Sequence, residues 1–155
     1  MKNFTNNIII KTTALKLWEA LTSKEFSRQY WSDREIRSEW KVGSPVSLVQ
    51  KDGTVNWQGK ILSYEPCTSL SYTFDVSADP RFHGISSEYE RFLAEEPVSK
   101  VTYKLKPFGD AMLLTIIHEE LSDKLEEVAS MSWAYVTSSL KSLLETGEPL
   151  AKLNV

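Results

Sequence analysis

The sequence predicts an α+β fold in which a curved antiparallel β-sheet packs around one long C-terminal helix. Several short segments alternate apolar and polar residues, as Leu70–Phe74 (LSYTF) does, which is typical of strands with one buried face. Two short helical patterns directly follow the first strand. One long amphipathic pattern between Ser122 and Thr146 comes last, and a helix in this place has a sheet to cover.

The first elements are a strand and two short helices. Asn7–Thr12 (NIIIKT) is rich in β-branched residues and predicts a strand. Thr13 is a suitable N-cap, and apolar residues recur at helical spacing after it, so a helix is expected there. A second helix is expected from Ser23 to about Tyr30–Trp31. The charged run Asp33–Arg37 is interpreted as a solvated loop.

The middle of the chain predicts a meander of antiparallel strands. Gly59 interrupts the longest of them, and a bulge or a sharp bend is expected there. A PFGDA turn joins the last two strands as a hairpin. The predicted strands are Ser44–Gln50, Thr54–Tyr64, Leu70–Phe74, Val101–Leu105 and Met112–His118.

Residues 75–100 form an insertion that is long for a hairpin connection, and such connections usually have structure or function of their own. Within it, residues 86–97 (SSEYERFLAEEP) predict a short amphipathic helix. Its apolar side chains Tyr89, Phe92 and Leu93 form either a lid over a pocket or a contact with a partner subunit. The sequence leaves both interpretations open.

The final helix has clear signals at both ends. Ser122 is placed to cap the first turn, acidic residues follow it near the positive end of the helix dipole, and Gly147 is placed to end the helix. Because a straight helix does not fill a strongly curved sheet, we expect a cavity between the two. The expected apolar stripe consists of Leu125, Ala129, Ser132, Val136, Leu140 and Leu143, widened by Val128, Trp133 and Leu144.

Composition narrows the class of protein. The 155 residues are expected to form one domain, 1–155. A net charge of −3 gives no basis for binding nucleic acid, and no apolar run approaches the ~20 residues of a membrane span. The single cysteine, Cys67, excludes an internal disulfide and is consistent with a reducing cytoplasm, so a cytoplasmic location is expected.

Five segments match the motifs of one known family, in order and over almost the whole chain. The opening contains WEALT (18–22), and SEWKVGSPV (38–46) fits the pattern W-x-x-G-S-x-V. The segment GKILSYEPCTSLSYTF (59–74) fits G-x-V-L-x-x-x-P-x-x-x-L-x-Y-x-F. The remaining two are SKVTYKLKPFGDAMLLTIIHEEL (99–121) and SWAYVTSSLKSLLETGEPL (132–150).

On these motifs the chain resembles the START-like (SRPBCC) helix-grip superfamily, and specifically the C-terminal domain of the heat-shock chaperone (Hsp90) ATPase activator family. The resemblance implies the element order β-α-α-β(6)-α, which agrees with the pattern above. Ser132 departs from the family, which commonly has glycine there.

The candidate site is an apolar, aromatic-lined pocket, since aromatic side chains are the usual walls of such pockets. For most of these residues a place in a solid core is the alternative. Tyr103 and Tyr135 could orient a ligand through their hydroxyls. The candidate ligand-binding residues are Trp18, Trp31, Trp57, Tyr72, Phe74, Tyr103, His118, Trp133, Tyr135 and Val136.

The chemistry of the remaining residues favours binding over catalysis. His118, followed by two glutamates, is either a general acid or base or, in the preferred interpretation, a structural residue at the end of a strand. No catalytic residue and no cofactor is assigned. The two histidines and one cysteine have no metal-ligand spacing, so no metal site is expected.

Three functions stay open. The first is binding of a small hydrophobic or amphipathic ligand. The second, from the resemblance, is regulation of a chaperone ATPase in a stress response. The third is a cyclase-like enzyme. The oligomeric state also stays open between a monomer and a homodimer, and Ser44–Gln50 and the insertion are expected to have apolar surface available for pairing.

Overall fold

The computed structural model describes residues 1–77, 79 and 98–153, and confirms the expected α+β fold and element order. The predicted helix at 86–97 lies outside the described residues. The elements are β1 (Lys2–Ile10), α1 (Ala14–Thr22), α2 (Lys24–Tyr30), β2 (Glu35–Ser38), β3 (Pro45–Val49), β4 (Val55–Glu65), β5 (Ser69–Phe74), β6 (Ser99–Phe108), β7 (Ala111–Leu121) and α4 (Asp123–Thr146).

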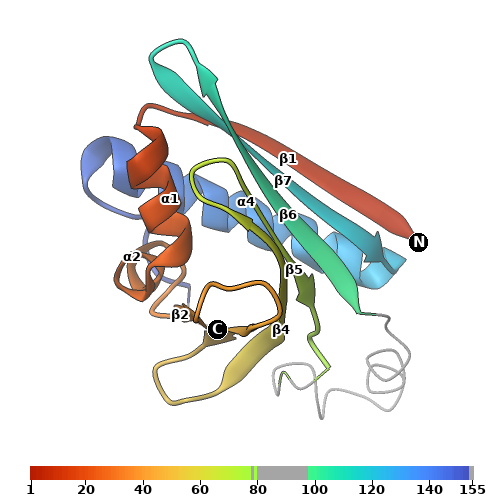
Figure 1. The fold of residues 1–155 in the computed structure, drawn as a ribbon. Helices are drawn as coiled ribbons and strands as arrows, with labels where there is room; N and C mark the ends of the chain where they lie inside the picture. Colours follow the sequence, from red (N-terminus) through yellow and green to blue (C-terminus); the bar gives the residue numbers. More distant parts are fainter. Residues whose placement is uncertain (78, 80–97, 154–155) are drawn as a thin grey trace.

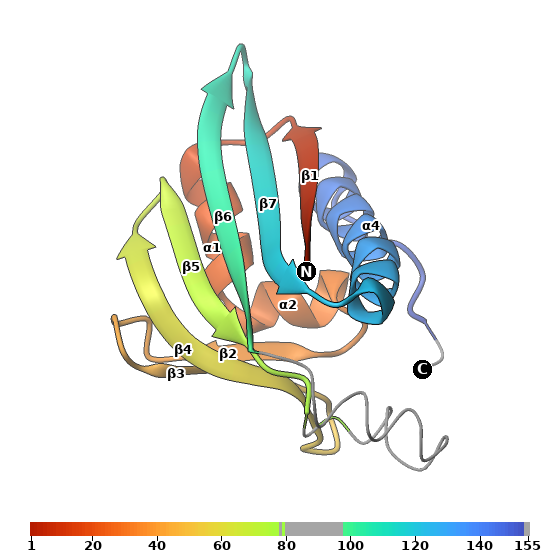
Figure 2. The same cartoon turned by 90° about the vertical axis from the view of Figure 1, so that its right-hand side faces the viewer.

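The strands form one seven-stranded antiparallel sheet in the order β1-β7-β6-β5-β4-β3-β2. The first strand therefore pairs with the last. Figure 1 shows α4 running across one face of the sheet, with α1 and α2 together at one end of it. Figure 2 shows the sheet curving, so that β3 and β2 turn toward α2.

Strand β4 forms the corner of the sheet. Residues 55–60 of β4 pair with β3, whereas residues 61–65 pair with β5, with a register shift between Ile61 and Ser63. Gly59 lies where the partners change, and a Cβ atom there would stand 1.7 Å from the backbone oxygen of Thr73. The predicted bend at Gly59 thus corresponds to a close backbone approach that only glycine permits, and the bulge follows it.

Helix α4 has the predicted ends. The Ser122 side chain accepts a hydrogen bond from the Leu125 amide, and Gly147 adopts φ +86° with its N–H bonded to the Leu143 oxygen. The apolar stripe differs from the prediction at one point, because Ser132 is exposed whereas Thr137 and Ser139 are buried.

Polar contacts connect α4 to β1, the edge strand beside it. The Asn6 amide donates to the Thr137 hydroxyl at 3.0 Å, and the Lys11 amide donates to the Glu145 carboxylate at 2.8 Å. Lys141 donates to the backbone oxygen of Ile9. The helix is therefore fixed against β1 along its second half.

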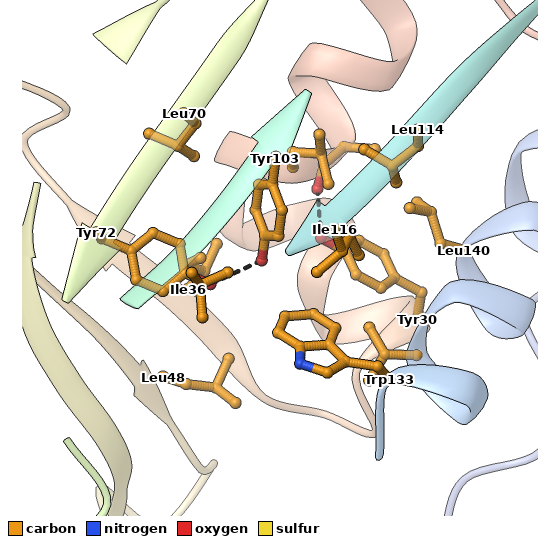
Figure 3. Packing of buried hydrophobic residues seen from close by; sticks show 14 of the residues in the cluster. Tyr30, Ile36, Leu48, Leu70, Tyr72, Tyr103, Leu114, Ile116, Trp133 and Leu140 are labelled. Atoms are coloured by element: carbon orange, nitrogen blue, oxygen red, sulfur yellow. Dashed lines mark hydrogen bonds between the residues drawn. The ribbon is translucent and has the colours of Figure 1, made fainter. Parts of the chain in front are cut away.

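Aromatic and branched apolar side chains fill most of the interior (Figure 3). Tyr72 and Tyr103 are almost fully buried, and their hydroxyls share a hydrogen bond of 2.7 Å. The Tyr30 hydroxyl donates to the backbone oxygen of Ala20 at 2.7 Å, which ties α2 to α1. Each buried phenol thus has the partner that burial requires.

Two expectations about surface segments are wrong. The charged run after α2 is not a solvated loop, because Glu35–Ser38 forms β2 and Arg34 is only 5% exposed. The strand expected at Ser44–Gln50 does not offer apolar surface for pairing. As β3 it lies between β2 and β4, and its Val46, Leu48 and Val49 are buried.

The corner at Gly59 predicts a large stability loss for Gly59→Ala. The added methyl group must push β4 away from the Thr73 carbonyl, and overpacking of this kind costs about 3 kcal/mol. Chemical denaturation measures the loss. The control is Gly53→Ala, where nothing lies within 4 Å and only the φ of +93° is unfavourable, so about 1 kcal/mol is expected. Equal losses would contradict the role given to Gly59.

Candidate functional site

A pocket of about 120 Å³ lies between the first half of α4 and the curved end of the sheet. Its walls come from α4, from strands on both sides of the β4 corner, and from the segment after α2. Its floor and sides are mostly apolar. The lining residues are Trp31, Ser32, Arg34, Leu48, Trp57, Phe74, Val76, His118, Leu125, Val128, Ala129, Ser132, Trp133, Tyr135, Val136 and Leu153.

Tryptophan side chains form the main wall of the pocket. The ring centroid of Trp31 lies 6.1 Å from that of Trp57 and 5.7 Å from that of Trp133. Trp57 also contacts Phe74, with ring centroids 5.1 Å apart. These rings come from four different parts of the chain and together form a preorganised apolar surface.

His118 is buried beside this wall and uses both ring nitrogens within the fold. The Trp133 indole N–H donates to His118 Nδ1 at 3.1 Å, so the ring carries its proton on Nε2, which donates to the Ser99 hydroxyl at 2.9 Å. Ser99 in turn donates to the backbone oxygen of Phe74 at 3.2 Å. This chain connects α4 to β7, β6 and β5 and agrees with the structural interpretation of His118.

Burial lowers the pKa of His118 from 6.5 to about 4. The ring is therefore neutral at pH 7, as the hydrogen bond from Trp133 to Nδ1 requires. Burial also holds the pKa of the Tyr72 and Tyr103 hydroxyls well above the usual range. These three groups keep their protons fixed near neutrality, which suits a structural network better than proton transfer.

The polar groups of the pocket are concentrated at its outer end, beside the C-terminal segment. The Leu153 amide donates to the Ser32 hydroxyl at 3.2 Å, and the Ser32 and Tyr135 hydroxyls lie 2.9 Å apart. The Tyr135 hydroxyl donates to the backbone oxygen of Ala151 at 2.9 Å. The segment after α4 thus folds back over the pocket, and the Leu153 side chain lines it.

Arg34 lies at the same end and is held in a fixed orientation. Its Nε donates to the Asn56 side-chain oxygen at 2.6 Å, and Nη1 donates to the Ser32 backbone oxygen at 3.2 Å. Asn56 is itself buried and donates to the Gln50 side chain at 2.8 Å. The guanidinium therefore places a permanent positive charge at the boundary between pocket and surface.

The structure brings most of the sequence-predicted site residues to this pocket. Trp18, Tyr72 and Tyr103 are the exceptions. Trp18 packs against Tyr64, whereas Tyr72 and Tyr103 lie in the core behind Trp57 and Trp133. The predicted residues that line the pocket are Trp31, Trp57, Phe74, His118, Trp133, Tyr135 and Val136.

At the polar end the sequence predicted Tyr135 but missed Arg34 and Leu153. Arg34 stands among charged residues that look solvated, and no local pattern marks it as buried. Leu153 follows the helix end at Gly147, and no periodicity predicts that the chain turns back along α4. Both positions are fixed by contacts between segments far apart in sequence, such as the one from Leu153 to Ser32.

Within the part of the chain that the structure describes, no three His, Cys, Asp or Glu side chains are grouped so that they could hold a metal ion. None of the helices in that part combines the length and the apolar character that crossing a bilayer requires.

A curved antiparallel sheet around a C-terminal helix, with a pocket between them, defines the START-like helix-grip class. Within this class the chain belongs to the family described as "Activator of Hsp90 ATPase homolog 1-like protein", whose model matches residues 11–145. A search of curated proteins gives no match.

Solved structures share the fold. A protein from Mesorhizobium loti, MLL2253, is similar with a TM-score of 0.72 and 20% identity, over 92% of this chain and 96% of that one. The Aha1 dimer from Colwellia psychrerythraea is similar with a TM-score of 0.69 and 19% identity, over 95% of this chain and 98% of that one. CalU16 from Micromonospora echinospora is similar with a TM-score of 0.72 and 20% identity, over 95% of this chain and 76% of that one. At these identities the likeness establishes the fold.

The buried neutral His118 predicts an acid-sensitive fold. Because its pKa is about 4 in the folded protein and near 6.5 when unfolded, the unfolded chain binds more protons between these values. The contribution of neutral His118 to the free energy of unfolding is fully present above pH 6.5, and about 3 kcal/mol of it is lost as the pH drops to 4. Urea denaturation at several pH values measures the slope.

The matched variant is His118→Gln, which does not titrate and retains hydrogen-bonding capacity. Other groups with lowered pKa, such as Glu35 and Glu145, titrate in both proteins, so the difference in slope isolates His118. We expect the free energy of unfolding of the variant to change less with pH between 6.5 and 4 than that of the original protein. Identical slopes would show that His118 is not the titrating group.

Proposed function

We propose that the protein binds a small hydrophobic ligand in the pocket between α4 and the sheet. The observation that carries this proposal is the wall formed by Trp31, Trp57 and Trp133, whose rings contact one another and line a space that the protein's own side chains leave open. A guest there buries apolar surface against this wall and away from water, and this burial is worth roughly 25 cal/mol per Å² before the costs of ordering.

The size of the pocket limits the ligand. Its volume is about 120 Å³, close to the ~150 Å³ of an engineered cavity that takes up benzene, and below the ~300 Å³ at which typical drug-sized sites begin. The pocket as it stands therefore suits a single aromatic ring or a group of similar size. A larger ligand fits only if part of it stays outside the pocket or if it displaces the Leu153 side chain.

The proposal predicts that Ala129→Leu abolishes binding. Ala129 lines the pocket from α4, and a leucine there fills the space with the protein's own side chain. We expect indole to raise the melting temperature of the original protein in a saturable way, and to leave that of the variant unchanged. The variant itself keeps or gains stability, because it fills a gap.

Ala134→Leu is the matched control for this experiment. Ala134 lies on the exposed side of the same helix and does not line the pocket, so the same substitution there must leave the response to indole intact. Indole that raises the melting temperature of the Ala129 and Ala134 variants equally would place binding elsewhere. No response in any of the three proteins would remove the proposal.

A second candidate function is regulation of a chaperone ATPase. The family match over residues 11–145 favours it, since the family is described by activation of the Hsp90 ATPase. Formation of a dimer by two copies of this chain is part of the same proposal, because one structural neighbour is described as a dimer. The cyclase-like enzyme receives no comparable support, since both nitrogens of His118 are engaged in the fold.

This candidate predicts that the purified protein raises ATP turnover by the host's Hsp90-type chaperone in a saturable way. Steady-state phosphate release, with and without the protein, measures the effect. Ala129→Leu separates the two functions, because a chaperone contact on the surface survives filling of the pocket. Turnover that is unchanged at saturating protein would dismiss chaperone activation.

A further inference from the structure

The outer end of the pocket is a partition between two spaces of different character. On the inner side lies the tryptophan-walled pocket. On the outer side is a polar hollow lined by residues of the β3–β4 turn and the segment after α2, among them Lys51 and Asp52. Ser32, Arg34 and Leu153 line both spaces, so they form the partition.

The segment 151–153 occupies this partition in the way that a ligand would. Leu153 lines the apolar pocket, the Ala151 carbonyl oxygen accepts a hydrogen bond from the Tyr135 hydroxyl, and the Leu153 amide donates to the Ser32 hydroxyl. The segment thus combines an apolar group with an oxygen acceptor a short distance away, and the site accommodates both.

The segment is weakly held. Leu153 is 49% exposed, so it contributes little burial, and the ion pair from Lys152 to Asp33, at 2.7 Å, has more than half of the lysine side chain in solvent. Displacing residues 151–153 therefore breaks only a few hydrogen bonds, and a ligand with an oxygen acceptor can form hydrogen bonds in their place.

The charge at the partition selects the kind of acceptor. The Arg34 guanidinium lies in the lining, fixed by Asn56 and by the Ser32 carbonyl, and a guanidinium binds a carboxylate more strongly than a neutral carbonyl group. Farther out, Asp33 and Asp52 line the polar hollow and oppose an anion there. The favourable place for one negative charge is therefore the partition itself.

We propose that the pocket takes a small aromatic carboxylic acid, which binds by displacing residues 151–153. The ring enters the space among Trp31, Trp57 and Trp133 that Leu153 borders, and the carboxylate accepts hydrogen bonds from the Tyr135 hydroxyl and the Arg34 guanidinium. This inference rests on the proposed function and adds to it the class of ligand and the segment that competes with it.

The test compares acids with their neutral amides of nearly equal size and shape. Isothermal titration at pH 7 is carried out with benzoate and benzamide, with indole-3-carboxylate and indole-3-carboxamide, and with indole itself. We expect each acid to bind at least tenfold more tightly than its amide. An amide that binds as well as its acid, or indole that binds while both acids do not, would overturn the ligand class and leave the proposed function intact. Failure of all five compounds would remove the proposed function itself.

Variants test the two parts of the site separately. Arg34→Gln is expected to remove the preference for the acid, so that acid and amide bind with about equal affinity. Arg34→Lys is expected to retain part of the preference. Because Arg34 is buried, near-ultraviolet circular dichroism first checks that these variants fold. Acid preference that persists in a folded Arg34→Gln protein would contradict the role of the guanidinium.

Leu153→Ala tests the displacement without touching the core. Removing the competing side chain is expected to tighten binding of acid and amide alike, by about threefold or more. Leu150→Ala is the control, since Leu150 is also partly exposed in the same segment but does not line the pocket, and its affinity must stay at the original value. Unchanged affinity in Leu153→Ala would show that the segment does not compete with the ligand.

Discussion

The contact of Gly59 with the Thr73 backbone is the constraint on which the rest of the structure depends. It lets β4 change partners within a few residues, from β3 to β5, and so turns the end of the sheet toward α2. Trp57 stands just before this corner, and Phe74 lies next to Thr73 on the strand across from it. A flatter sheet would carry these rings away from Trp133 on α4, and no aromatic wall would form.

The polar groups at the two ends of the pocket have hydrogen-bond partners of different kinds. The hydrogen-bond chain from Trp133 through His118 and Ser99 ends at the backbone oxygen of Phe74 and connects α4 with three strands. At the outer end, Ser32 and Tyr135 bond instead to a short segment that is half in solvent. The inner wall is thus fixed by bonds between sheet and helix, whereas the outer end depends on a segment that is partly exposed, and the proposed site lies between the two.

The sequence predicts the features that depend on local chemistry. The caps of α4 at Ser122 and Gly147, the alternating strands and the special place of Gly59 all follow from residue type and spacing. Features that depend on tertiary contacts do not follow. The short strand β2 and the burial of Arg34 come from pairing with β3 and Asn56, and their sequence has the charges of a surface loop. The position of Leu153 has no periodic signal either, because one hydroxyl 121 residues away determines it.

The order of strands in the sheet has a consequence for how the chain reaches this structure. β1 pairs along its length with β7, so Ile8 faces Leu114 and Asn6 faces Ile116. During synthesis on the ribosome the first strand emerges long before β7, its neighbour in the described sheet, and helix α4, which also packs on β1, emerges later still. Pairings this distant close large loops, so folding is expected to be slow for a domain of this size. Until β7 and α4 arrive, Ile10, which is fully buried in the folded protein, and Ile8, which packs against the core, therefore stay uncovered.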